Sequence, residues 1–141
     1  MDLLKLARKK PVLADASMTV SEAIGRMVTN NVGAVVVTDS ARHVLGIFTE
    51  RDVLCRVAFK KLDAEKTLLR SVMTRPVQTA TADTSIEEAL SMMIVGKYRH
   101  LPVVDTLERV IAIVSLRYLL MRRLSEHRLL QRHLQDEFIC Q

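Results

Sequence analysis

The stretch VLGIFTERDVL at residues 44–54 changes from a β-branched, strand-like run into the start of a helix, and Thr49 and Asp52 lie at the change. A Thr followed three residues later by an acid is a common helix start, because the hydroxyl and carboxylate satisfy backbone N–H groups without helical partners. The same pair could hold a ligand. A carboxylate accepts hydrogen bonds from both vicinal hydroxyls of a ribose, and a helix N-terminus attracts phosphate. Both roles stay open, and they are compatible.

Other residue types that carry catalysis lack a suitable spacing. No glycine-rich phosphate loop is present, because the four glycines are isolated: Gly25, Gly33, Gly46 and Gly96. Cys55 and Cys140 lie far apart, and no His, Cys and acid cluster has metal-binding spacing. No nucleophile has a base nearby in sequence. We expect no enzyme, no catalytic cofactor and no metal.

The elements that position these residues occur twice. Residues 21–54 align with residues 87–120 at a constant spacing of 66, without a gap. Upstream, residues 3–12 align with residues 68–77 at a spacing of 65, which predicts one added residue in between. Agreement over such a length indicates two copies of one structural unit.

Each copy has the same predicted layout. A short extended piece follows Pro11 or Pro76, and an amphipathic helix comes next. The predicted apolar faces of the two helices are Val20, Ala23, Ile24, Met27 and Val28, and Ile86, Ala89, Leu90, Met93 and Ile94. Two strands joined by a polar turn then lead directly into another helix. We predict an α/β (α+β) fold whose two units share one core, since each alone is small.

The paired pattern resembles two cystathionine-β-synthase (CBS) domains in tandem, the arrangement called a Bateman module. The resemblance rests on MTVSEAI, GAVVVTD and LGIFTERD in the first copy, and on MTRPV, TSIEEAL, RHLPVVD and IAIVSL in the second. It implies two pseudo-symmetric β-α-β-β-α repeats, at residues 5–60 and 71–122. A connecting segment at 61–70 and a C-terminal helical extension at 123–141 complete the expected organisation.

The resemblance also implies a function. Clefts between such repeats bind adenosine-containing ligands in many members, which act as sensors and not as catalysts. For this chain it implies a non-catalytic regulatory module that binds AMP, ADP, ATP, NAD(H) or S-adenosylmethionine, with Asp52 as the ribose acceptor. The alternative is a ligand-free structural module for dimerisation or protein interaction. The motif reads only the shared adenosine, so the sequence does not name the ligand.

The implied ligand-binding residues come from both copies. The base would lie along Pro76, Val77 and Gln78, near Tyr98. Cations for phosphate are Arg51, Lys97, Arg99 and Arg117, of which Arg99 is preferred because it precedes a strand; each could equally be a solvated surface residue. His100 could reach a phosphate or be structural. At the positions of Thr49 and Asp52 the second copy has Ser115 and Tyr118, so it keeps the hydroxyl and loses the carboxylate. The cleft beside Tyr118 would be empty, or would use the ring to stack on or exclude a base.

The composition limits the kinds of partner that we expect this chain to bind. The formal charge of +5 and the pI near 9.6 favour anionic partners. With no Trp, two Tyr and three Phe, a base-stacking surface for nucleic acid is not expected. No apolar run reaches the roughly 18–20 residues that a membrane span needs, and the N-terminus does not resemble a signal peptide. The two distant cysteines suit a reducing cytoplasm.

The C-terminal stretch carries a broad apolar stripe of leucines among arginines. The leucines are Leu116, Leu119, Leu120, Leu124, Leu130 and Leu134, and the arginines are Arg117, Arg122, Arg123, Arg128 and Arg132. Such a helix would pack on its own module or on a dimer mate, or would dock a partner protein. We expect a homodimer and a regulated protein partner that the sequence does not identify.

Overall fold

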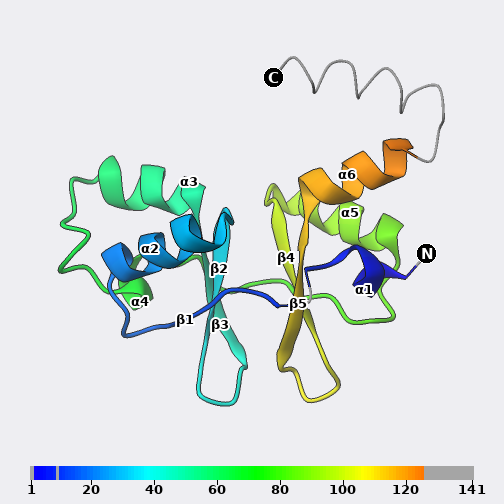
Figure 1. Ribbon diagram of the computed structural model, residues 1–141, viewed down its shortest axis with the longest axis horizontal. Coiled ribbons are helices and arrows are strands. Elements are labelled where there is room, and N and C mark those ends of the chain that lie inside the picture. The colour runs from blue at the N-terminus through cyan, green and yellow to red at the C-terminus, as the bar shows by residue number, and fades with distance from the viewer. Residues whose placement is uncertain (1, 9, 126–141) are drawn as a thin grey trace.

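Two α/β units lie side by side in the computed structural model, which describes residues 2–8 and 10–125 (Figure 1). The first unit contains β1 (Leu13–Asp15), α2 (Val20–Asn30), β2 (Ala34–Thr38), β3 (Val44–Thr49) and α3 (Glu50–Asp52), and α3 continues as a π-helical segment, η1 (Val53–Ala58). The second unit contains α5 (Ile86–Gly96), β4 (His100–Val104), β5 (Val110–Ser115) and α6 (Leu116–Ser125). The predicted mixed fold with two matching units is confirmed.

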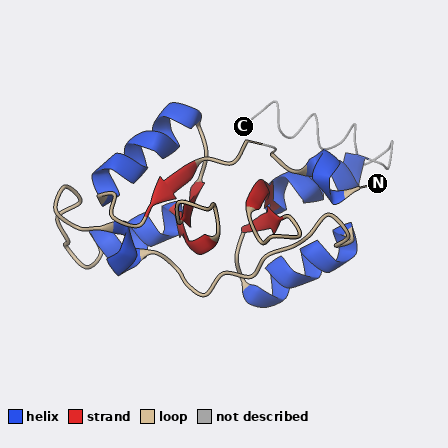
Figure 2. Cartoon of the chain, turned by 90° about the horizontal axis from the view of Figure 1, so that it is seen from below, coloured by secondary structure: helices blue, strands red, loops and turns tan. Residues whose placement is uncertain are grey.

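The sheets lie toward the middle of the molecule and the helices lie outside them (Figure 2). In the first sheet β1 pairs parallel with β2, and β2 pairs antiparallel with β3. In the second sheet β4 and β5 are antiparallel, and Ala80 makes a single parallel bridge to Val103 where the first unit has β1. The two hairpin tips touch, since the N–H of Val110 donates to the carbonyl of Arg42 at 2.9 Å. This contact fixes one end of the boundary between the units.

The core differs from the prediction of one shared core, because the buried residues form two clusters. The helix α1 (Leu3–Leu6) packs in the cluster of the second unit, where Leu3 and Leu6 join Leu101 and Val114. The helix α4 (Leu69–Val72) packs in the cluster of the first unit. Helix α1 precedes the strands of the first unit but covers the core of the second. Helix α4 precedes the strands of the second unit but covers the core of the first. The chain must then cross between the units twice, once after α1 and once after α4.

Equivalent bridges anchor both crossings. Arg8 pairs with Ile113 on β5, and Thr74 pairs with Ile47 on β3. Arg8 and Thr74 are 66 positions apart, and so are Ile47 and Ile113. The first residues of the two leading helices, Leu3 and Leu69, have the same spacing. The predicted 65-residue spacing with an added residue is therefore wrong. Matching Pro11 to Pro76 favoured it, whereas the backbone hydrogen bonds fix 66 throughout.

Only one edge of each predicted apolar helix face reaches the core. Val20, Ala23 and Met27 are buried on α2, and the equivalent Ile86, Ala89 and Met93 are buried on α5. Ile24 and Leu90 pack at the margins of the clusters. Val28 and Ile94 are 73% and 60% exposed, so the prediction that they face the core is wrong. The sheet touches the i, i+3, i+7 line of each helix and leaves the flanking i+8 position in solvent.

Candidate functional site

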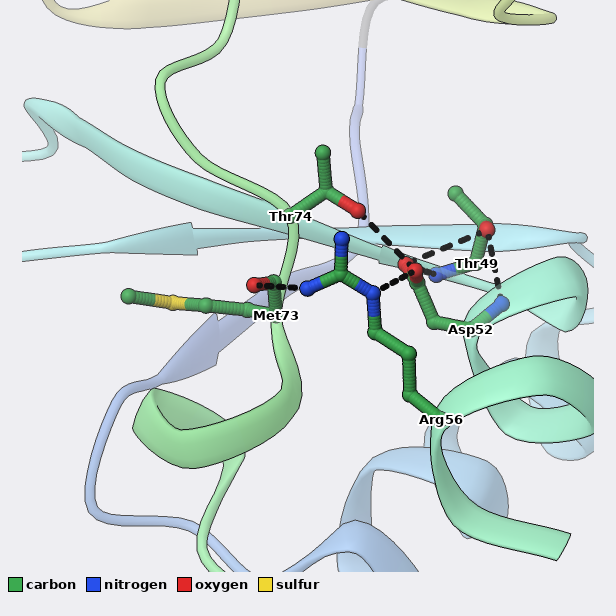
Figure 3. Close-up of polar contacts among 5 residues, drawn as sticks. All are labelled: Thr49, Asp52, Arg56, Met73 and Thr74. Atoms are coloured by element: carbon green, nitrogen blue, oxygen red, sulfur yellow. Dashed lines mark hydrogen bonds and ion pairs between the residues drawn. The ribbon is translucent and has the colours of Figure 1, made fainter. Parts of the chain in front are cut away.

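The junction between β3 and α3 is a buried helix cap. Asp52 is only 6% exposed, although it is charged. Its Oδ2 accepts hydrogen bonds from the backbone N–H of Thr49 at 3.0 Å and from the Thr49 hydroxyl at 3.2 Å. In return, the Thr49 Oγ1 accepts the N–H of Asp52 at 3.3 Å (Figure 3). The predicted capping role of these two residues is confirmed.

The second carboxylate oxygen holds the crossing segment. Asp52 Oδ1 accepts the hydroxyl of Thr74 at 2.9 Å and lies 3.4 Å from Nε of Arg56. Arg56 also donates from Nη1 to the carbonyl oxygen of Met73 at 3.2 Å (Figure 3). Both oxygens of Asp52 are engaged, so a ribose could bond to this carboxylate only by replacing the contacts from Thr74 and Arg56.

The residues expected around the adenine base come shortly after Thr74 in the chain. Pro76 and Val77 lie in the crossing segment between Thr74 and the Ala80 bridge. The Tyr98 hydroxyl donates to the side-chain oxygen of Gln78, so these two predicted residues are together. Burial raises the pKa of Tyr98, which keeps the hydroxyl protonated as a donor. Arg51 is exposed on the first turn of α3, next to Asp52 in sequence.

A cleft of about 700 Å³ lies between the units at the second junction. One wall is formed by residues 5–8, and a second by residues 31–34, which lead into β2. The third wall is the β5–α6 junction with the start of β4. The lining residues are Lys5, Leu6, Ala7, Arg8, Val12, Asn31, Val32, Gly33, Ala34, Glu50, Arg99, His100, Ile113, Ser115, Arg117 and Tyr118. The N–H of Tyr118 donates to Ser115 Oγ at 3.4 Å, so the capping hydroxyl is kept. Five predicted site residues thus share this cleft, and Arg99 is one of them.

The cleft beside Tyr118 is strongly basic. Lys5, Arg8, Arg99 and Arg117 line it, and the lining contains one carboxylate, Glu50. Among the described residues, no carboxylate lies within ion-pair distance of these four cations. Arg8 donates from Nε to the carbonyl oxygen of Lys10. The walls therefore present positive charge that no ion pair within residues 2–8 and 10–125 neutralises.

His100 completes the polar lining and is half-buried. Burial lowers its pKa below the ordinary value of 6.5, nearby Glu50 acts against this, and Arg99 adds to it. The imidazole is consequently neutral at pH 7 and can accept or donate one hydrogen bond. It adds no charge of its own to the cleft.

Several residues in these arrangements were not predicted, among them Lys5, Arg8, Arg56 and Thr74. Lys5 and Arg8 belong to the basic KLARKK run, and Arg8 occupies the position equivalent to Thr74. Extending the 66-residue spacing upstream would have matched Arg8 to Thr74. Arg56 could have been found as the i+4 partner of Asp52 on a helix.

Within residues 2–8 and 10–125, no group of three His, Cys, Asp or Glu could hold a metal ion, and no helix is long and apolar enough to span a membrane. Leu116 is half-buried, Leu119 is buried, and Leu120 and Leu124 are exposed. Leu130, Leu134, Arg128 and Arg132 of the predicted stripe lie outside the described residues.

Comparisons with known proteins agree with the repeat. The family model for the CBS domain matches residues 2–58 and 69–125. A CBS domain-containing protein of Arabidopsis thaliana, CBSCBSPB2, is 41% identical over 112 residues, which are 79% of this chain and 21% of that protein. An uncharacterised 17.7 kDa protein of Acidianus ambivalens is 32% identical over 123 residues, 87% of this chain and 73% of that protein. This chain spans about a fifth of the length of the Arabidopsis relative.

A solved structure has the same fold. The CBS domain pair of protein MJ0100, crystallised with 5'-methylthioadenosine and S-adenosyl-L-methionine, superposes with a TM-score of 0.81. The alignment covers 90% of this chain and 98% of that one, at 23% identity. At this identity the likeness concerns the fold.

Proposed function

The chain belongs to the CBS domain family as a pair of CBS domains, and we propose that it is a non-catalytic regulatory module that binds an adenosine-containing nucleotide between its repeats. The observation that carries the proposal is the basic cleft of about 700 Å³ between the units. Its volume suits a small-molecule ligand. Its cations, which form no ion pair with the carboxylates of the described part of the chain, suit phosphate. The candidate ligands are AMP, ADP, ATP, NAD(H) and S-adenosylmethionine.

At the first junction, Asp52 would accept the ribose hydroxyls in exchange for its present partners. The Thr74 hydroxyl and the Arg56 guanidinium both contact Oδ1, and a vicinal diol offers two donors in their place. The displaced contacts hold the segment that crosses to the second unit. Ligand binding would thereby loosen or reposition that segment, which couples the first junction to the relation between the repeats.

The signal would leave the module through its helices. Equivalent apolar positions are exposed on both units, Val28 with Ile94 and Leu54 with Leu120. Two matching apolar surfaces suit a second copy of the chain, so we propose a homodimer that also presents a surface to a regulated protein. We place the module in the cytoplasm, because the exposed Cys55 is a free thiol that suits a reducing compartment.

Thermal unfolding with a panel of nucleotides tests this function. A ligand at one hundred times its Kd stabilises the folded state by about 2.7 kcal/mol. We expect at least one adenosine compound to raise the Tm at millimolar concentration, and the matched guanosine compounds to raise it less. No shift with any adenosine compound would instead favour the second candidate, a ligand-free dimerisation module, for which the saturated Asp52 carboxylate is the supporting observation.

A further inference from the structure

The two junctions are equivalent in backbone and opposite in charge. At the first, the carboxylate of Asp52 meets the hydroxyl of Thr74. At the second, the equivalent positions carry the ring of Tyr118 and the guanidinium of Arg8, both in the wall of the cleft. An acid and a neutral donor in one repeat are thus exchanged for a phenol and a cation in the other.

This exchange removes the group that would bind a ribose. A phenol has one oxygen with a single proton, so it lacks the charge and the paired oxygens with which a carboxylate accepts two vicinal hydroxyls. Glu50 is the one carboxylate of the lining, and it comes from the other repeat, at the start of α3. At the position equivalent to Asp52, the second junction therefore has no carboxylate.

The same exchange adds a binding group for anions. Arg8 joins Lys5 on one wall, while Arg99 and Arg117 come from the second unit. Four cations against one carboxylate exceed what a single phosphate, with at most two negative charges, would neutralise. A chain of two or three phosphates carries three or four charges and can touch several walls at once.

We infer that the cleft beside Tyr118 is a polyphosphate site that holds a ligand by consecutive phosphates and does not read its ribose. The inference rests on the proposed function in taking the clefts as ligand sites, although phosphates alone would satisfy it. Arg8, from the segment that leads to the first crossing, and Arg117, from the start of α6, are the residues that determine this specificity. A nucleoside diphosphate or triphosphate would bind here in either its ribo or its 2'-deoxy form.

Titration calorimetry with sodium triphosphate and with inorganic phosphate, at low salt, tests the charge argument. Triphosphate should bind at least about ten-fold more tightly than phosphate, and Arg8→Ala and Arg117→Ala should each weaken it by about ten-fold or more. Lys60→Ala is the matched control, because it removes the same charge from an exposed position that is not part of the lining. Equal binding of the two anions, or an equal loss in the control, would overturn the inference.

Competition tests the sugar argument at the same cleft. ATP and 2'-deoxy-ATP should displace bound triphosphate at concentrations within about three-fold of each other. A ten-fold advantage for ATP would contradict the inference, since the ribose would then be read. Displacement by ATP and GTP alike, with no preference for adenosine compounds, would refute the proposed function and leave this site standing; nucleotide binding without triphosphate binding would do the reverse.

Discussion

The hydroxyl of Thr74 donates a hydrogen bond to Oδ1 of Asp52 at 2.9 Å and so joins the crossing segment to the helix start of the first repeat. Arg56 reinforces the link, since it contacts the same oxygen and the carbonyl of Met73 (Figure 3). A residue that caps a helix therefore also holds together segments that lie 22 positions apart. This double role explains why the acid is buried here, while the second repeat needs only Ser115 for its cap.

Thr74→Val should destabilise the protein, because it removes the hydroxyl that donates to a buried carboxylate. We expect a loss of about 1.5–3 kcal/mol in the free energy of unfolding, the range for hydrogen bonds to charged groups. Urea unfolding measures it. Thr106→Val, at an exposed turn position, is the matched control and should change stability by less than about 0.5 kcal/mol. Equal effects of the two substitutions would show that the Thr74 contact is not structural.

Gly46→Ala should also destabilise the protein, because an added Cβ would lie 2.6 Å from the sulfur of Met73 and 3.1 Å from the carbonyl oxygen of Thr74. We expect a cost of about 1–3 kcal/mol, typical of overpacking. The second repeat has Ala112 at the equivalent strand position and Ala7 at the position equivalent to Met73; Ala112 is buried in its core and the partly buried Ala7 packs against that core. Met73 and Gly46 in the first repeat thus correspond to two alanines, Ala7 and Ala112, in the second.

A double-mutant cycle with Met73→Ala separates this contact from a general effect of the substitution. Because removing the Met side chain removes the clash, the double variant should lose less stability than the sum of the two single losses, by at least about 0.5 kcal/mol. Strictly additive losses would show that Gly46 is not required for the close approach of Met73.

Much of the fold could be predicted from the sequence, because the repeat spacing and the polar turns are local signals. Thr49 and Asp52 were correctly predicted as a cap for the same reason. The leading helices were harder, since nothing in LLKL or LLRS says which of two similar cores it will cover. The contacts of Asp52 with Thr74 were also hidden, because a pairing 22 positions apart depends on where the chain crosses. Likewise, Lys5 and Arg8 became candidate ligand residues only when the crossing brought them to Tyr118.

Stability should fall as the pH drops through the range in which His100 titrates. Burial lowers the pKa of His100 in the folded protein, so the unfolded chain takes up a proton first, near pH 6.5. Below that pH the unfolded state binds more protons, and the free energy of unfolding decreases until the folded pKa is passed. His100→Gln should flatten the dependence between pH 7.5 and 5.5, as followed by urea unfolding. An unchanged slope in the variant would assign the dependence to other groups.

Assembly should depend on the exposed apolar positions shared by the two units. Sedimentation at micromolar concentration should give twice the 15.9 kDa chain mass. Leu54→Asp and Leu120→Asp should shift the protein toward monomer, because a charge is costly to bury in an interface. Leu107→Asp, at an exposed turn position away from these helices, should leave the dimer intact. A wild-type monomer would exclude the proposed dimer.

The affinity for AMP of the wild type, Asp52→Asn and Arg56→Ala, measured by calorimetry, tests the central claim most directly. AMP has one phosphate, so it favours the junction of Asp52 over the polyphosphate cleft. Asp52→Asn should bind about ten- to a hundred-fold more weakly, because a charged acceptor is lost. Arg56→Ala should bind several-fold more tightly, because the ribose no longer has to displace the guanidinium from Oδ1. If all three proteins bind AMP equally, Asp52 is only a cap and a link between the repeats, and its role as the ribose acceptor is contradicted.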